Sequence, residues 1–432
     1  MSKLLRGRRN LTIADQIVVS ASNFATGIIL VRGLGLKQFG VFTVAFALVL
    51  LLISIQLSFI CSPMITLSAL SEDGTPRNRY LQGMFGVELW FCAAATVAAV
   101  IISVVFLRLR PQPDEMKILI PFVLSIVFYL MQDWIRRYFF AAGKAPLAVL
   151  NDVIRYVGQT VVLLVLVALR ELTVCSTFWT IAITSIAAVV VGLAAERIRY
   201  DGAPTRDSWN RSRGLSRDLA LASQLQWVVY QGAMLIGAAM LGAEAAGSIR
   251  ATQNVVGPVN VGYQAMENIV PIKAGEEMRR GGIRQVAKFL YRFGAQGLVV
   301  LAVFFLVIGL FSRQFLEFFY GHEVAVYGAV LDLQLVYFLL FWPLRQLSYL
   351  FRTINRTPVL LMASFFAALA SMLLIYPCVR SFGDIGIMIA AVAGQAVNLI
   401  YLAWMWLRIR SSLELADGTL DAAPRLVASK VE

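Results

Sequence analysis

Charged residues are scarce in this sequence. Asp, Glu, Lys and Arg make up 15% of its 432 residues, whereas hydrophobic residues make up 59%, and the mean hydropathy is +0.75. About a quarter of the residues of an average soluble protein are charged. The scarcity of charge therefore argues against a soluble globular protein of this length.

Histidine and the common catalytic motifs are also lacking. The single histidine, His322, excludes sites that need two histidines, such as common zinc-hydrolase sites. There is no GxxxxGK[ST] phosphate-binding loop, no CxxC pair and no nucleophile elbow, and the four cysteines show no paired spacing. We therefore expect no cofactor, no metal and no enzymatic activity.

Long apolar runs are what the sequence has in abundance. Twelve runs of about 18 residues or more are each long enough to cross a hydrocarbon core as a helix. The sequence thus predicts an all-α, polytopic membrane protein with about twelve transmembrane helices. The expected spans are 12–31, 41–63, 82–106, 118–135, 147–169, 174–195, 218–240, 248–270, 287–310, 328–350, 358–378 and 385–407.

The formal net charge of +13 is unevenly distributed along the chain. If the N-terminus is cytoplasmic, 27 of the 38 lysines and arginines fall in inner segments and eight in outer loops. This asymmetry follows the positive-inside rule. The basic balance therefore reflects topology, with both termini in the cytoplasm, and we expect no nucleic-acid partner.

A repeated motif indicates an internal duplication. "LGLKQFGVF" at 34–42 resembles "LGAEAAGSI" at 241–249, which lies 207 residues later. A second pair, "RYFFAAGKAP" at 137–146 and "SYLFRTINRTP" at 348–358, lies at a similar offset. Two halves of six spans each share one orientation, so they form a parallel repeat about an axis along the membrane normal.

The duplication predicts the domain organisation. We expect two six-helix lobes around a central polar cavity, because transporters built from such repeats place the substrate at the repeat interface. The predicted segments are an N-terminal lobe at 1–195, a cytoplasmic basic linker at 196–217, a C-terminal lobe at 218–410 and a cytoplasmic tail at 411–432.

The eighth expected span carries a polar stripe. Its polar and small residues are spaced by three or four, which places them on one helix face. A charge in the middle of a bilayer costs about 2.5–3.5 kcal/mol on insertion scales, so this face contacts protein or water rather than lipid. The stripe consists of Arg250, Gln253, Gly257, Asn260, Gln264 and Glu267.

The first expected span has a shorter polar stripe, and several spans contain single charges. The first-span stripe includes Gln16 and Asn23. Arg155 lies one turn from Asp152, so it either forms a structural intrahelical ion pair or has a functional role. Whether Arg345 is structural or functional is likewise open. The acidic candidates for binding a coupling proton or sodium ion are Asp15, Glu88, Asp133, Glu267 and Asp332.

The segment "GIILVRGLGLKQFGVFTVAFA" at 27–47 resembles the first-to-second-span signature of the polysaccharide-biosynthesis flippases. In that signature an apolar helix is followed by Arg, Leu-Gly, a short turn, Phe-Gly and an aromatic residue. These flippases belong to the multidrug/oligosaccharidyl-lipid/polysaccharide exporter superfamily, whose twelve-span, two-lobe plan is similar to this chain. The chain departs from the signature at "LSFICSPMITL", where the family has a glycine-containing turn. The matching residues are Arg32, Leu34, Gly35, Phe39, Gly40 and Phe42.

The resemblance implies a flippase. Its substrate would be a polyprenyl-diphosphate-linked oligosaccharide, moved from the inner to the outer leaflet of a bacterial inner membrane for exopolysaccharide or O-antigen synthesis. Membrane lipid, a polysaccharide polymerase and export machinery are the further expected partners. Arg250 is the first candidate for the diphosphate and Arg32 the second, because guanidinium groups make bidentate contacts with phosphate. The amide candidates for the sugar are Gln253, Asn254, Asn260, Gln264, Asn23 and Gln16.

Two alternative functions remain open on the sequence. One is a cation-coupled exporter of drugs or small molecules from the same superfamily, which would depend on acidic and aromatic pockets more than on arginines. The other is a membrane glycosyltransferase or polymerase, which would need a larger extramembrane surface than the longest expected outer loop, 311–327, supplies.

Overall fold

The computed structural model describes residues 2–69, 75–109, 113–196, 198, 200–354 and 356–428, and every regular element in these ranges is helical. The first half comprises α1 (Ser2–Leu34), α2 (Leu36–Gln56), the π-helical η1 (Leu57–Cys61), α3 (Ser62–Ala69), α4 (Thr75–Leu109), α5 (Pro113–Ala141), α6 (Ala145–Asp152), the π-helical η2 (Val153–Val157), α7 (Gly158–Ala168) and α8 (Val174–Glu196).

The second half contains a connecting helix and the remaining spans. Its elements are α9 (Gly202–Trp227), the π-helical η3 (Val228–Gly232), α10 (Ala233–Leu241), α11 (Ala243–Leu310), α12 (Ser312–Tyr320), α13 (His322–Ala325), α14 (Gly328–Thr353), α15 (Thr357–Phe382) and α16 (Asp384–Ala428). Gly281 and Gly282 interrupt α11, and the positive φ of 65° at Gly282 separates an arm at 243–280 from an arm at 283–310.

The predicted membrane-spanning class is confirmed. Within the described residues, ten helices are long and apolar enough to cross a membrane. They coincide with ten of the twelve expected spans. The other two expected spans, 218–240 and 248–270, are also helical: Val228–Leu241 is apolar but short, and the first arm of α11 carries the polar stripe.

Apolar side chains cover the outside of the bundle. On α7 and on the second arm of α11, valines and leucines such as Val161, Leu164, Val299 and Val303 are more than half exposed. An apolar surface of this extent is unfavourable in water and suits contact with lipid. Exposure of these residues is therefore what a membrane-spanning bundle requires.

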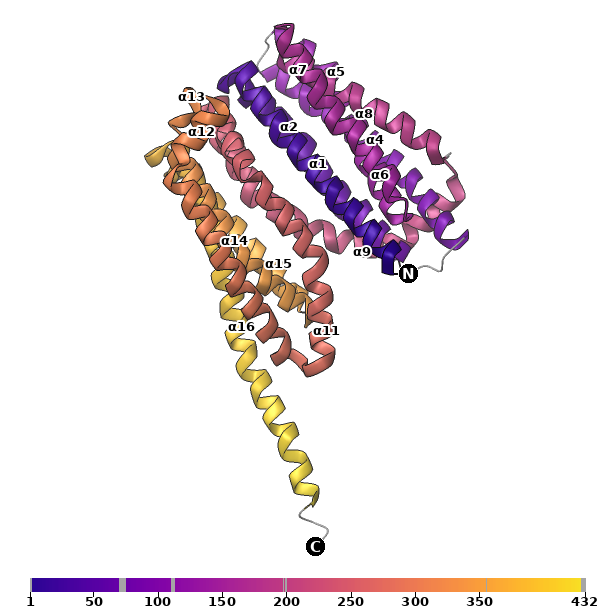
Figure 1. The fold of residues 1–432 in the computed structure, drawn as a ribbon, viewed down its shortest axis with the longest axis vertical. Coiled ribbons are helices and arrows are strands. Elements are labelled where there is room, and N and C mark those ends of the chain that lie inside the picture. Colours follow the sequence, from indigo (N-terminus) through magenta and orange to yellow (C-terminus); the bar gives the residue numbers. More distant parts are fainter. Residues whose placement is uncertain are drawn as a thin grey trace.

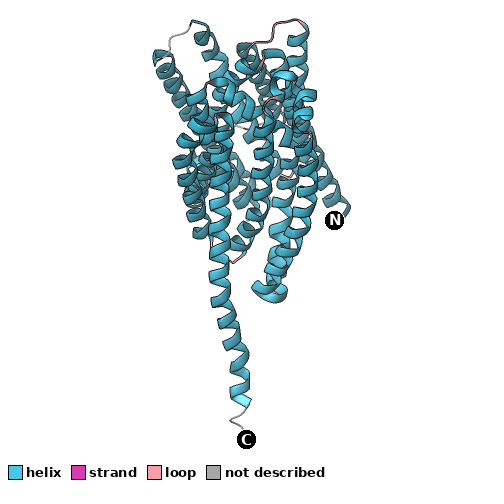
Figure 2. Cartoon of the chain, turned by 90° about the vertical axis from the view of Figure 1, so that its left-hand side faces the viewer, coloured by secondary structure: helices cyan, strands magenta, loops and turns pink. Residues whose placement is uncertain are grey.

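The helices form two lobes, as the duplication predicts. Figure 1 shows the first lobe, from indigo to magenta, beside the second, from red to yellow, with α1 and α2 next to α11 between them. Both termini lie at one end of the molecule, which we call the terminal end (Figure 1). Helices α12 and α13 lie at the opposite end, which we call the α12 end. In the perpendicular view, the last helix, α16, extends far beyond the bundle at the terminal end (Figure 2).

The backbone repeats at both motif pairs. Gly35 and Gly242 precede α2 and α11 with φ, ψ of 75°, 162° and 101°, 174°, a conformation that only glycine adopts readily. Lys144 and Arg356 precede the helices that start after the second motif, with φ, ψ of −103°, 51° and −109°, 46°. Matching turns at corresponding places support the duplication.

The two copies of the first motif also contact each other. A Cβ added to Gly40 would lie 1.8 Å from the carbonyl oxygen of Ala243, and one added to Gly247 would lie 2.6 Å from that of Leu36. Real atoms never approach so closely, so both positions require glycine. The repeated sequence therefore brings the backbones of the two lobes into close contact.

The segment expected to be a linker contains a helix. From Gly202 onward, the stretch at 196–217 forms the start of α9, which packs along α4 of the first lobe. Ser208 donates to the carbonyl oxygen of Tyr80 at 3.1 Å, and the rings of Phe59 and Trp209 lie 5.2 Å apart. The connection is thus a docked amphipathic helix rather than an extended chain.

Gly40→Ala is expected to destabilise the protein, because its methyl group meets backbone atoms that cannot rotate away. The expected loss is about 1–3 kcal/mol of the free energy of unfolding, typical of overpacking. The matched control is Gly262→Ala, also in a helix, where an added Cβ meets no atom within 4 Å.

Thermal melts of the two purified variants in detergent test this packing. Gly262→Ala should melt at or above the wild-type temperature, because alanine favours the helix. Equal melting temperatures for Gly40→Ala and Gly262→Ala would contradict the close approach of α2 and α11.

Candidate functional site

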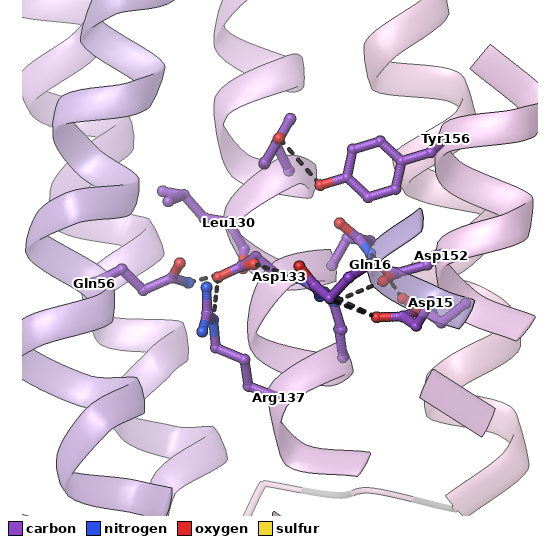
Figure 3. A network of polar contacts seen from close by, with 12 residues as sticks. Asp15, Gln16, Gln56, Leu130, Asp133, Arg137, Asp152 and Tyr156 are labelled. Atoms are coloured by element: carbon purple, nitrogen blue, oxygen red, sulfur yellow. Dashed lines mark hydrogen bonds and ion pairs between the residues drawn. The ribbon is translucent and has the colours of Figure 1, made fainter. Parts of the chain in front are cut away.

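A network of charged groups lies inside the first lobe. Arg136 on α5 is 11% exposed and forms ion pairs with Asp15 of α1 at 3.0 Å and Asp152 of α6 at 2.5 Å. Its third acidic neighbour is Asp133, at 3.9 Å. Figure 3 shows these carboxylates converging from separate helices. The network therefore holds α1, α5 and α6 together.

Asp133 and Asp152 have additional partners in the same network. Arg137 donates from Nε to Asp133 at 2.7 Å (Figure 3). Gln132 donates to both Asn151 and Asp152 at 2.9 Å. Because the acids are paired with arginines and amides, their charges are largely neutralised within the lobe.

Glu88 has different surroundings. Its carboxyl group is fully buried on α4, where Oε1 accepts from Gln56 at 2.6 Å and from the Cys92 thiol at 3.1 Å. Its Oε2 has no hydrogen-bond partner, and no arginine or lysine of the described part lies within 4.0 Å of it. Glu88 is thus a buried carboxyl without a neutralising cation.

Arg155 lies in η2 among aromatic rings. Its guanidinium carbon is 4.5 Å from the ring centre of Tyr129 and 5.1 Å from that of Tyr156. Its Nη1 donates to Gln159, which in turn donates to Thr26 of α1 at 3.2 Å. The intrahelical pair with Asp152 that the spacing allowed is absent, because Asp152 pairs with Arg136 instead.

Arg250 lies between the lobes, on the first arm of α11. Its Nη1 donates to Gln253 at 3.1 Å, which confirms that these two stripe residues share a helix face. The hydroxyl groups of Tyr230, Tyr129 and Tyr320 are close enough to interact electrostatically with its guanidinium. Tyr129 belongs to the first lobe and the other two to the second, so groups of both lobes interact electrostatically with Arg250.

Arg32 joins the lobes at the α12 end. Its Nε donates to the carbonyl oxygen of Phe319 at 2.8 Å, and its Nη2 donates to that of Phe318. These carbonyls belong to the last turn of α12, where the helix dipole favours a cation. The rings of Phe24 and Phe319 add an edge contact at 5.1 Å.

The other candidates are dispersed. Gln16 donates to Asp15 at 3.3 Å, and Asn23 is exposed on α1. The amide of Asn254 packs against Gly27, and Asp332 lies beside Ser312 and Arg313 at the α12 end. The side chains of three candidates lie outside the described residues, although their backbone is helical: Asn260, Gln264 and Glu267.

The roles of Arg136 and Arg137 were not apparent from the sequence. We expected them in an inner loop, but α5 continues to Ala141, so both are helical and mostly shielded from solvent. The spacing of three and four residues from Asp133 was the available signal, because residues so placed share a helix face. The tyrosines around Arg155 and Arg250 were also missed, and no spacing in the sequence reveals them.

Comparison with known proteins gives a match at the level of structure only. No protein-family model and no curated protein matches the sequence. A structure of the lipid II flippase MurJ in an inward closed conformation superposes with a TM-score of 0.68 at 14% identity, covering 98% of this chain and 93% of that one.

Several transporters of the MATE family match almost as well. An inward-facing multidrug resistance MATE transporter has a TM-score of 0.67 at 14% identity, covering 94% of this chain and 95% of that one. A transporter from Pyrococcus furiosus has a TM-score of 0.63 at 15% identity over the same shares. The chain therefore shares the helical fold of these solved transporter structures. At these identities the likeness establishes the two-lobe architecture, and the substrate has to be argued from the residues.

Arg136→Met is expected to lower the free energy of unfolding by about 3–5 kcal/mol, the usual effect of leaving buried carboxylates without their cation. The control is Arg79→Met, which removes a 4.0 Å pair with Asp207 whose partners are 61% and 74% exposed. That pair should contribute less than about 1 kcal/mol. Thermal melts in detergent compare the two, and similar small losses would show that the Arg136 network does not stabilise the lobe.

Proposed function

We propose that the protein is a flippase that moves a polyprenyl-diphosphate-linked oligosaccharide from the inner to the outer leaflet of a bacterial inner membrane. The proposal rests on the surroundings of Arg250. Its guanidinium lies at the lobe interface with an amide as its hydrogen-bond partner, and no carboxylate of the described part pairs with it. A phosphate group is the ligand that such a guanidinium binds best.

The physical task fits this architecture. A sugar diphosphate cannot cross hydrocarbon unaided, whereas its polyprenyl tail can stay in the bilayer. The lobes, taken as 1–195 and 218–410, would rock about the interface and expose Arg250 to each side in turn. No covalent bond has to change, which agrees with the transporter neighbours and with a non-enzymatic role.

We assign the remaining candidates on the same basis. Gln253 and Asn254 lie next to the interface and would bind sugar hydroxyls, together with the other amide candidates: Asn260, Gln264, Asn23 and Gln16. Arg32 would reach a ligand only after releasing the α12 carbonyls, so we rank it below Arg250.

A cation-coupled exporter of drugs or small molecules is the second candidate, and Glu88 is the observation that favours it. A buried carboxyl without a cation is suited to bind a proton. Glu88 therefore leads the coupling candidates. The other coupling candidates are Asp15, Asp332 and Glu267.

The test uses cells that lack the chain. We expect polyprenyl-diphosphate oligosaccharide to accumulate in the cytoplasmic leaflet of their inner membrane, as measured by lipid extraction and a leaflet-specific labelling assay. Wild type and Arg380→Ala, which changes an exposed arginine, should relieve the accumulation. Arg250→Ala at equal abundance should not, because a charge-assisted hydrogen bond contributes about 1.5–3 kcal/mol.

Two other outcomes would redirect the assignment. Repeat units that accumulate in the outer leaflet would indicate a block after flipping, as expected for a polymerase. Absence of any accumulated lipid-linked sugar, together with increased drug sensitivity, would support the exporter.

A further inference from the structure

Arg155 is the most completely buried arginine of the described residues. It is 1% exposed, its Nη1 donates to Gln159, and its Nε has no hydrogen-bond partner. No carboxylate in the described part lies within ion-pair distance of its guanidinium. Its nearest acid in the sequence, Asp152, is engaged by Arg136 and Gln132.

Such burial is unfavourable unless another group compensates for it. Arginines are almost never fully buried without a partner, because a guanidinium removed from water loses its hydration. Stacking on Tyr129 and Tyr156 replaces part of that hydration, but cation–π contacts are weaker than ion pairs. Arg136 offers the contrast within the same lobe, because two carboxylates neutralise it.

The local backbone conformation explains why Arg155 does not pair with Asp152. It occupies the centre of η2, a π-helical turn between α6 and α7. A π-helical turn adds a residue to the helical repeat and shifts the side chains that follow, and such turns are frequent at functional sites. Asp152, at the end of α6, points to Arg136, while Arg155 turns to the rings of Tyr129 and Tyr156.

Tyr129 relates Arg155 to Arg250. Its ring lies under the guanidinium of Arg155, and its hydroxyl lies within electrostatic range of Arg250. The same hydroxyl is 3.3 Å from that of Tyr156. One arginine from each lobe thus interacts with the same tyrosine, and neither forms an ion pair with an acid of the described part.

We propose that Arg155 and Arg250 together form the diphosphate site, with one arginine contributed by each lobe and with the Tyr129 and Tyr156 hydroxyls as further donors. This inference rests on the proposed function, because it takes the diphosphate as the anion. Two adjacent phosphoryl groups offer each guanidinium its own pair of oxygens. Since Arg155 is covered in this structure, the ligand enters when the lobes separate, and its binding draws both arginines to one anion.

The test measures binding to the full chain in lipid nanodiscs. The probe is undecaprenyl diphosphate, with undecaprenyl monophosphate for comparison, and the readout is the rise in melting temperature with probe concentration. Wild type should bind the diphosphate more tightly than the monophosphate. Arg155→Met and Arg250→Met should each weaken diphosphate binding at least tenfold, and Arg155→Lys should weaken it several-fold because lysine lacks the bidentate geometry.

Melting without the probe separates a binding role from a structural one. Arg155→Met should melt at or above the wild-type temperature, because it removes a buried charge that has no acid partner. The matched control, Arg136→Met, should melt well below wild type, because it strands two carboxylates. Arg155→Lys provides the binding measurement if the methionine variant does not fold.

Three results would overturn the inference, and they separate it from the proposed function. Unchanged diphosphate affinity in Arg155→Lys and Arg155→Met would remove Arg155 from the site while leaving the flippase intact. A large loss of melting temperature in Arg155→Met with unchanged affinity would make Arg155 a structural residue. Failure of wild type to bind either lipid would reject the diphosphate substrate itself.

Discussion

Neutralisation of guanidinium groups inside the bundle governs the architecture of the first lobe. A buried charge without a partner costs several kcal/mol, so Arg136 has to stay paired with its carboxylates in every conformation of the lobe. Those carboxylates come from α1 and α6, which are far apart in the sequence. The ion pairs therefore resist any motion of α1 against α5 and α6. These three helices are thereby tied together, as the proposed rocking between two states would require.

The contacts between the lobes are of a weaker kind. At the α12 end, Gly40 and Gly247 bring backbones together, and Arg32 binds two carbonyl oxygens. When the lobes separate, water can hydrate these carbonyls and this guanidinium, so opening does not strand a buried charge. Strong pairing within a lobe and replaceable contacts between lobes together favour separation at the interface over unfolding of either lobe.

Much of this fold follows from the sequence, because membrane spans and repeats leave periodic signals. Apolar runs gave ten spans that coincide with helices, and the repeated motif indicated a duplication that agrees with the matching backbone conformations at Gly35 and Gly242. Contacts between distant helices leave no such signal. Nothing near Arg136 in the sequence points to Asp15, and the pairing of Asp152 with Arg136 rather than Arg155 depends on a π-helical turn that the apolar pattern does not encode.

The distribution of unpaired charge bears on the choice between an anionic and a cationic cargo. Asp15, Asp133 and Asp152 of the first lobe are paired with Arg136 and Arg137, so these three aspartates present little negative potential to the interface. Glu88 contacts Gln56 and Cys92 within the lobe, away from Arg250 and its tyrosines. At the interface, Arg250 has no acidic partner among the described residues, and Arg155, which also lacks one there, lies behind Tyr129. A cationic drug would be repelled by these guanidinium groups, whereas a diphosphate would supply the negative charge that the described acidic side chains do not bring to them.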